Sequence, residues 1–181
     1  MKSKIGYVVA ISTSGKKWND GRAGNIRDMF NNTLQEAKDR VQISTFTLGY
    51  DNDEVNDFFE IIKELVKSER KVQLIVNDDN ENRKKKNPSC SNYAKKEISK
   101  LQKKYPDRFF PQYFKSTSKG ILHAKIVVVD SKTALVGSAN ISRHALSLNH
   151  EIMLKISGDV AGDLSLLFDE LSKTLRDEAD G

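Results

Sequence analysis

The apolar positions in the first half of the chain alternate between two spacings. Short, mostly apolar runs over 4–12, 41–48 and 71–76 predict β-strands. Between these runs, stripes with intervals of three and four residues begin at Ile26 and Val55 and predict amphipathic helices. This order of strands and helices predicts an α/β fold, in which helices cover both faces of a mixed or largely parallel sheet.

The middle of the chain is more polar. Positions 77–92 have no periodicity and predict a loop. The stripe over 93–105 predicts a helix that can dock on the sheet and turn its lysines outward. The aromatic run over 109–114 predicts a short strand, and its proline limits hydrogen bonding to neighbouring strands.

The C-terminal third contains three more apolar runs and a final helix. The runs over 124–129, 134–136 and 152–156 predict strands, and the polar residues at 131–133 predict a turn that returns the second strand beside the first. The last stripe is the clearest in the chain and predicts a helix that faces the core. Its members are Val160, Leu164, Leu167, Phe168, Leu171 and Leu175.

The apolar run over 124–129 is preceded and interrupted by two residues with chemical uses. His123 and Lys125 are two positions apart, and alternate residues of a strand share a face, so we expect an imidazole beside an ammonium. Near neutral pH a histidine can act as a base or a nucleophile, and a fixed lysine charge suits a phosphate oxygen. This pair favours an anionic substrate.

The returning strand is expected to bring a second group of polar residues to the level of His123. Gly137 allows the backbone to approach a ligand closely, and the Ser138 hydroxyl and Asn140 amide can donate hydrogen bonds to phosphoryl oxygens. Glu151 precedes the third apolar run and can accept a hydrogen bond from one ring nitrogen of His123. The other nitrogen would then be left to attack.

Together these residues follow the pattern HxKx4Dx6GSxN with an acid further on, and this pattern resembles the HKD motif of the phospholipase D superfamily. The alternative is an ordinary surface hairpin, which would require many residue types to coincide at fixed offsets. The resemblance implies a phospholipase D-like fold that forms a single domain over 1–181, and it implies that the protein is an enzyme, a phosphodiesterase. The implied catalytic residues are His123, Lys125, Asp130, Ser138, Asn140 and Glu151. Asp130 is expected to be structural or a partner of Lys125.

The resemblance also implies a mechanism. Members of this superfamily build one active site from two HKD motifs, whereas this chain contains one, so the resemblance implies a homodimer whose subunits each contribute His123 and Lys125. One His123 would form a phosphohistidine, and the opposing His123 would act as general acid and then as general base. Lysines and amides would neutralise the phosphoryl charge, so neither a divalent metal nor another cofactor is expected.

Composition limits the class of protein. A chain of 181 residues with 38% hydrophobic and 30% charged residues is typical of one domain with a polar surface. No apolar run approaches the length of a bilayer span, and the N-terminal run is interpreted as a strand, not as a signal peptide. Cys90 is the only cysteine, which excludes an internal disulfide, and we expect an inert thiol in a polar loop. A cytoplasmic location is expected.

Positive charge is concentrated just before the motif. Between Arg83 and Lys119 there are twelve basic and two acidic residues, so this segment carries +10 in a chain whose net charge is +5. Such a segment is suited to steer a polyanion toward the site. The candidate substrate-binding residues are Lys84, Lys85, Lys86, Lys119, Gly137 and Arg143.

These features favour a nuclease, acting on DNA in preference to RNA. One alternative is a phospholipase D-type enzyme that acts on lipid head groups. Another is a nucleic acid-binding subunit of a restriction or defence assembly, although an intact His123 and Lys125 argue against it.

Overall fold

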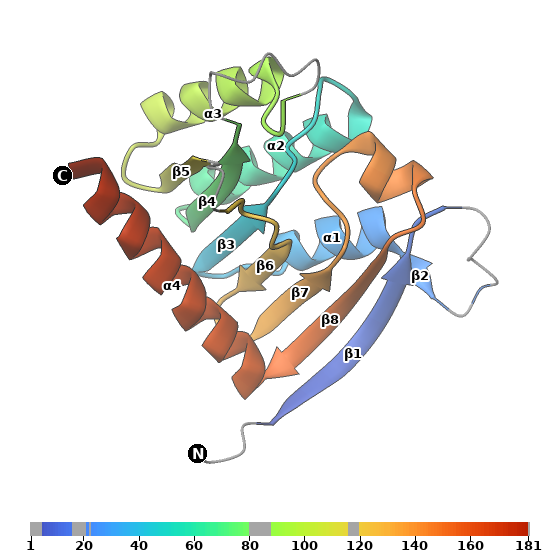
Figure 1. The fold of residues 1–181 in the computed structure, drawn as a ribbon. Helices are drawn as coiled ribbons and strands as arrows, with labels where there is room; N and C mark the ends of the chain where they lie inside the picture. Colours follow the sequence, from blue (N-terminus) through green and yellow to red (C-terminus); the bar gives the residue numbers. More distant parts are fainter. Residues whose placement is uncertain (1–4, 16–20, 22, 80–87, 116–119, 181) are drawn as a thin grey trace.

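A mixed eight-stranded sheet forms the centre of the protein in the computed structural model, which describes residues 5–15, 21, 23–79, 88–115 and 120–180 (Figure 1). The strand order is β2-β1-β8-β7-β6-β3-β4-β5. The strands are β1 (Gly6–Thr13), β2 (Gly24–Asn25), β3 (Arg40–Thr45), β4 (Lys71–Asp78), β5 (Phe109–Lys115), β6 (Ile126–Val129), β7 (Thr133–Gly137) and β8 (Ile152–Gly158).

Parallel pairing is confined to two parts of the sheet. The neighbours β1 and β2, β3 and β4, and β4 and β5 are parallel, and the remaining neighbours are antiparallel. The α/β class and the mixed sheet are therefore confirmed, but the sheet is not largely parallel. The reason is that β6, β7 and β8 follow one another through connections without a crossover helix, and such strands pair antiparallel.

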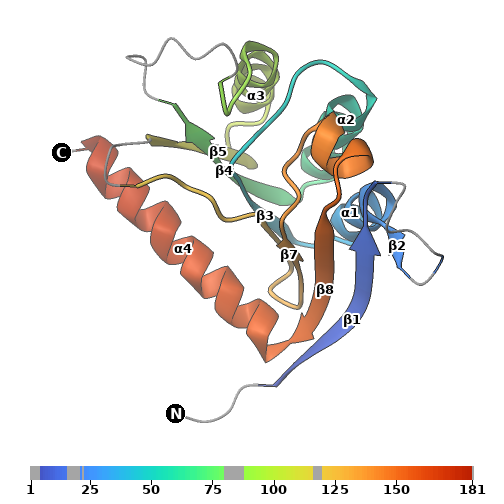
Figure 2. The same ribbon diagram turned by 45° about the vertical axis from the view of Figure 1, so that its right-hand side comes forward.

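Helices cover both faces of the sheet, as expected (Figure 2). They are α1 (Ile26–Gln35), α2 (Asp53–Lys67), α3 (Asn92–Lys104) and α4 (Asp159–Asp180), with a short π-helix η1 (His144–Leu148). The first three helices pack on one face around the main core, to which Phe30, Phe58 and Ile98 contribute. Their N-termini are capped by Asn25, Asn52 and Ser91, each of which accepts a hydrogen bond from a backbone N–H three residues later.

The helix α4 alone crosses the opposite face, and its contact surface is more polar than expected (Figure 2). Leu167, which belongs to the predicted apolar stripe, is 65% exposed, while Ser165 and Ser172 are buried. The Ser165 hydroxyl donates to Gln42 Oε1 at 2.7 Å, and the sheet also presents Arg40 to this helix. Polar side chains on this face of β3 need hydrogen-bonding partners, so the helix turns serines toward them and exposes a leucine.

Cys90 lies in the core, and not in a polar environment. It is fully buried beside Leu48, to which it is joined by a β-bridge. Burial raises the pKa of its thiol to about 12. Because the thiolate is the reactive form of cysteine, an inert thiol is the consequence, as expected, although for a different structural reason.

Candidate active site

The residues of the motif other than Asp130 gather at the end of the sheet where β3 ends and β6 begins. These two strands are antiparallel, with Ser44 opposite Ile126, so the segment before β6 lies beside the end of β3. The strand β6 begins only at Ile126, which places His123 and Lys125 in the irregular segment before it and corrects the prediction that both lie in the strand. That segment is held by Ser44, whose hydroxyl donates to the carbonyl of Ala124 at 3.2 Å.

Lys125 is buried at the bottom of this site. Its side chain is 7% exposed, and its ammonium donates to the carbonyl oxygen of His123 at 2.7 Å. The same ammonium lies 5.6 Å from the centroid of the Phe46 ring, within the range of a cation–π contact. Burial lowers the pKa of Lys125, and the negative charge of Glu151 opposes that shift. A cation that has lost much of its water gains more from a phosphate ligand than an exposed lysine does.

His123 lies above Lys125 and faces solvent. Its ring is exposed, and the ring centroid is 5.1 Å from that of Phe46, with the two planes tilted by 54°. Within the described part of the chain, no hydrogen bond fixes either ring nitrogen. The imidazole and the ammonium thus meet on one aromatic ring, and a ligand can approach the imidazole from solvent.

Phe46 is a residue that the sequence argument did not identify. It follows the last residue of β3 and contacts both His123 and Lys125, although it lies about eighty positions before them. Only its place at the carboxyl end of a strand hinted at a role, because ligand sites of open α/β sheets lie at that end.

Ser138 and Glu151 face each other across β7 and β8. The Ser138 hydroxyl donates to a carboxylate oxygen of Glu151 and accepts from the backbone N–H of Ile152 at 3.2 Å. Asn149 donates to the other carboxylate oxygen at 3.4 Å. In this structure Glu151 is hydrogen-bonded to Ser138. Among the described residues, no hydrogen bond joins Glu151 to His123. If Ser138 donates to a phosphoryl oxygen, its bond to Glu151 must first be released.

Asn140 joins the turn after β7 to the end of β3. Its Oδ1 accepts from the backbone N–H of Thr47 at 2.9 Å, and the N–H of Ile141 donates to the carbonyl of Thr47 at 3.1 Å. Because a backbone N–H needs an acceptor, this contact orients the amide and makes Nδ2 the atom that can donate to a ligand.

Gly137 is required by the packing of the sheet. A β-carbon at this position would lie 2.2 Å from the carbonyl oxygen of Ile152 and 2.8 Å from Cα of Met153. Close contact with β8 is therefore one reason for glycine here, and the approach of a ligand to this backbone stays a prediction.

Asp130 lies at the opposite end of β6, away from Lys125. Its carboxylate accepts hydrogen bonds from the backbone N–H groups of Lys38, Asp39 and Arg40, each at 2.9 Å. Burial by itself would raise the pKa of this carboxyl, but the three N–H donors outweigh it and hold the pKa below its usual range. Of the two roles expected for Asp130, the structural one is observed: it anchors the loop between α1 and β3 and is not a partner of Lys125.

The candidate substrate-binding residues are only partly placed. Lys84, Lys85, Lys86 and Lys119 lie outside the described residues. Arg143 is exposed; it lies two residues after Ile141 and immediately precedes η1. Lysines of α3 such as Lys96 and Lys103 are exposed, as expected for a helix that turns its charges outward.

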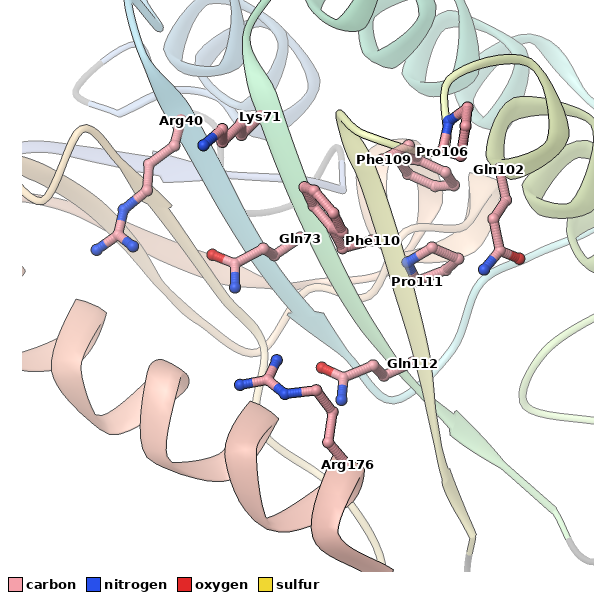
Figure 3. Close-up of a pocket in the computed structure, with 10 residues that line it drawn as sticks. All are labelled: Arg40, Lys71, Gln73, Gln102, Pro106, Phe109, Phe110, Pro111, Gln112 and Arg176. Atoms are coloured by element: carbon pink, nitrogen blue, oxygen red, sulfur yellow. The ribbon is translucent and has the colours of Figure 1, made fainter. Parts of the chain in front are cut away.

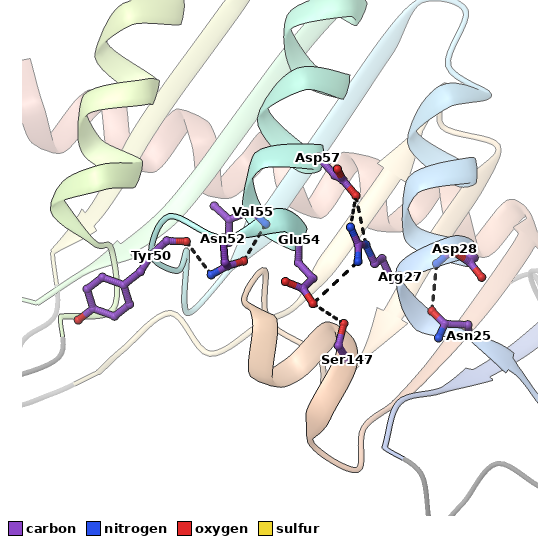
Figure 4. Close-up of polar contacts among 9 residues, drawn as sticks. All are labelled: Asn25, Arg27, Asp28, Tyr50, Asn52, Glu54, Val55, Asp57 and Ser147. Atoms are coloured by element: carbon purple, nitrogen blue, oxygen red, sulfur yellow. Dashed lines mark hydrogen bonds and ion pairs between the residues drawn. The ribbon is translucent and has the colours of Figure 1, made fainter.

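The η1 segment is anchored to α2 through a buried carboxylate (Figure 4). Glu54 is 7% exposed, accepts from the Ser147 hydroxyl at 2.6 Å and lies 3.9 Å from a guanidinium nitrogen of Arg27. Burial by itself would raise the pKa of Glu54, but the bond from Ser147 and the charges of Arg27 and Arg143 lower it. This contact holds η1, which Arg143 immediately precedes, against the N-terminal end of α2.

Two further observations concern ligands and membranes. Among the described residues, no group of three or more His, Cys, Asp or Glu side chains is arranged to hold a metal ion. No helix in the described ranges is both long enough and apolar enough to cross a bilayer.

Comparison with known proteins identifies a family. The sequence model described as "Cardiolipin synthase, PLD-like domain" matches residues 30–174, which is most of the chain. No curated protein sequence matches.

Solved structures share the fold. NucT from Helicobacter pylori superposes with a TM-score of 0.65 at 20% identity, covering 90% of this chain and 95% of NucT. The phospholipase D family member Nuc from Salmonella typhimurium gives 0.64 at 14% identity, with 92% and 93% covered. Phosphatidylserine synthase from Haemophilus influenzae gives 0.64 at 14% identity, with 91% of this chain but only 38% of the synthase covered.

Proposed function

The chain belongs to the phospholipase D superfamily and is a phosphodiesterase, and from this premise we propose that it is a nuclease that hydrolyses DNA through a phosphohistidine on His123. The observation that carries the proposal is the arrangement of an exposed imidazole over a buried ammonium at one end of the sheet. The two neighbours named NucT and Nuc, both covered over more than nine tenths of their length, support a nuclease over a lipid enzyme.

In the proposed reaction a ring nitrogen of His123 attacks phosphorus. The phosphorus–nitrogen bond forms, the bond to the leaving oxygen breaks, and that oxygen takes a proton from a second imidazole. Water then attacks the phosphohistidine: its oxygen bonds to phosphorus, the second imidazole accepts its proton, and the phosphorus–nitrogen bond breaks, which releases the phosphate product and restores His123. Lys125 and the Nδ2 donor of Asn140 stabilise the charge on the phosphoryl oxygens.

The second imidazole is proposed to come from another copy of the chain, because the motif occurs once. Exposed apolar side chains next to the site support a partner at this position. Ile121 is 49% exposed two residues before His123, Ile152 is 40% exposed directly after Glu151, and Leu148 in η1 is 51% exposed. Apolar side chains at the edge of a polar site are typical of protein interfaces.

A lipid substrate remains the second candidate, favoured by the same apolar rim and by the synthase among the structural neighbours. The choice of DNA over a lipid is supported by the basic segment between Arg83 and Lys119, because such a segment suits an extended polyanion. A cytoplasmic location stays a prediction.

The substrate experiment uses plasmid DNA, single-stranded DNA, RNA and phospholipid vesicles, each in excess chelator. We expect cleavage of DNA by the wild type and none by His123→Ala. His144→Ala is the matched control, because it removes an exposed histidine outside the motif, and it should cleave normally. Lipid turnover without DNA cleavage would contradict the proposal, and so would DNA binding without cleavage that is identical in the wild type and His123→Ala.

The shared site has a separate test. Wild type and His123→Ala are mixed at constant total concentration and allowed to exchange subunits. If each site needs both imidazoles, activity falls with the square of the wild-type fraction. A linear fall would show that one copy carries a complete site and would remove the dimer from the mechanism.

A further inference from the structure

A pocket separate from the His123 site lies toward the opposite end of the sheet. It has a volume of about 490 Å³ and lies between α4 and the first residues of β4 and β5 (Figure 3). The helix α4 crosses the sheet obliquely, as Figures 1 and 2 show, and leaves this corner uncovered. Because β3 is five residue steps long, Arg40 in this pocket lies about 15 Å from the end of β3 that is beside His123. Gln112, which the strand register places level with Ser44, extends the lining toward that end.

The floor of the pocket is formed by alternate residues of neighbouring strands. The strand register places Arg40 beside Lys71 and Gln73 beside Phe110, all on the face that α4 covers elsewhere. Phe109 points the other way into the main core and is 1% exposed, whereas Phe110 is 40% exposed. A large aromatic ring therefore stays open to a ligand within a concave surface (Figure 3).

The charges that line the pocket have one sign. Arg40, Lys71 and Arg176 contribute three cations, and none of the described lining residues is acidic. Arg40 is partly neutralised by Asp169 at 3.3 Å, and Arg176 donates to the Ser172 hydroxyl at 2.9 Å.

Two lining side chains make no polar contact within the described part of the chain. Neither the ammonium of Lys71 nor the amide of Gln73 makes a hydrogen bond or ion pair with another described residue, although both belong to the ordered strand β4. The pocket thus offers an aromatic face, an amide with donors and an acceptor, and a cation that forms no ion pair within the described residues.

We propose that this pocket binds a nucleotide unit. The base would stack on Phe110, because every base has a flat face that can stack on an aromatic ring. The Gln73 amide can bond the edge of the base, and Lys71 with Arg176 can bind the phosphate. The volume lies within the range of small-molecule sites. The unit is either a free nucleotide or one residue of a single strand. The proposal does not depend on the nuclease function, because its residues take no part in the His123 site.

Binding is measured by calorimetry with AMP, a short single-stranded oligodeoxynucleotide and inorganic phosphate. The His123→Ala protein is used so that the strand is not cut. On this background Phe110→Ala should weaken binding of AMP or of the strand by about tenfold, the loss expected for one stacked base. Lys71→Ala should weaken it by about fivefold, the value of an exposed charge pair. Both residues are partly or fully exposed, so the variants should fold, which circular dichroism checks.

The matched controls remove an exposed ring and an exposed lysine elsewhere. Tyr7→Ala, on β1, and Lys67→Ala, on α2, should leave binding unchanged. Binding of AMP alone would identify a free nucleotide as the ligand, and binding of the strand alone would identify a nucleic acid, and either supports the proposal. It is overturned if neither probe binds, if both pocket variants bind normally, or if phosphate binds as tightly as AMP.

Discussion

The imidazole of His123 packs against the phenyl ring of Phe46, with their centroids 5.1 Å apart. The Lys125 ammonium lies over the same ring. One aromatic side chain thus supports both reactive groups of the site from the side opposite to solvent, which gives Phe46 a positioning role.

We expect Phe46→Ala to lower kcat by about tenfold or more while KM changes little, because a displaced nucleophile loses alignment and not affinity. Phe46→Tyr keeps the ring and should restore most of kcat. Steady-state kinetics on the substrate that the cleavage experiment identifies measures both constants, with Tyr7→Ala as a control for loss of an exposed ring. Equal losses in the Ala and Tyr variants, or a change in KM alone, would contradict the positioning role.

The pH dependence of activity should report on Lys125. Burial lowers the pKa of Lys125, so the ammonium loses its proton, and the alkaline limb of kcat/KM falls, at a pH below the value for an ordinary lysine. The charge of Glu151 opposes this shift. Glu151→Gln removes that charge and should move the limb to still lower pH.

The measurement is kcat/KM against pH for the wild type and Glu151→Gln. Glu60→Gln removes an exposed carboxylate on α2 and should leave the profile unchanged. If the alkaline limb of Glu151→Gln stays in place or moves to higher pH, the charge of Glu151 does not act on the Lys125 ammonium.

Asp130→Ala should lower stability, and not the chemistry of the folded protein. Removal of the carboxylate leaves three backbone N–H groups without their acceptor, which we expect to cost about 2 kcal/mol at neutral pH. The folded pKa of Asp130 is depressed, so its contribution is present above the ordinary aspartate pKa and is lost as pH falls through the folded value. Chemical denaturation measures the free energy of unfolding of Asp130→Ala and the wild type at pH 7 and near pH 3. The difference between the two proteins should be smaller near pH 3.

Asp107→Ala, which removes an exposed aspartate, serves as the control for Asp130→Ala. If Asp130→Ala abolished turnover while its free energy of unfolding stayed at the wild-type value, Asp130 would belong to the chemistry after all.

Gly137→Ala should destabilise the protein by about 1–3 kcal/mol, the usual cost of overpacking. The added carbon would meet the backbone of β8, which cannot move without breaking the sheet. Gly120→Ala is the matched control, because no atom lies within 4 Å of the added carbon there. Thermal unfolding gives the melting temperatures of both variants. Equal melting temperatures would show that β8 accommodates the added carbon without loss of stability.

Local patterns accounted for most of the elements and for the candidate chemistry. Helices such as α1 and α2 were predicted because their apolar residues recur at intervals of three and four within one short segment. The motif from His123 to Glu151 was visible because its residue types and offsets lie within one short segment.

Contacts between distant segments were not visible in the same way. Phe46 reaches His123 only because β3 pairs with β6, and Asp130 finds its partners in the loop before β3. The predicted stripe of α4 does face the sheet, except at Leu167, which is exposed because the polar face of the sheet at Arg40 and Gln42 draws Ser165 inward.

The sequence by itself determined the order of the elements, the family motif and the presence of an imidazole and an ammonium suited to a phosphodiester. Those properties follow from periodicity and spacing, which act over a few residues. Only the tertiary structure decided that Phe46 supports the pair, that Glu151 bonds Ser138 and that Asp130 is an anchor. Strand pairing and helix docking join residues far apart in the chain, and their register depends on the packing of the whole sheet.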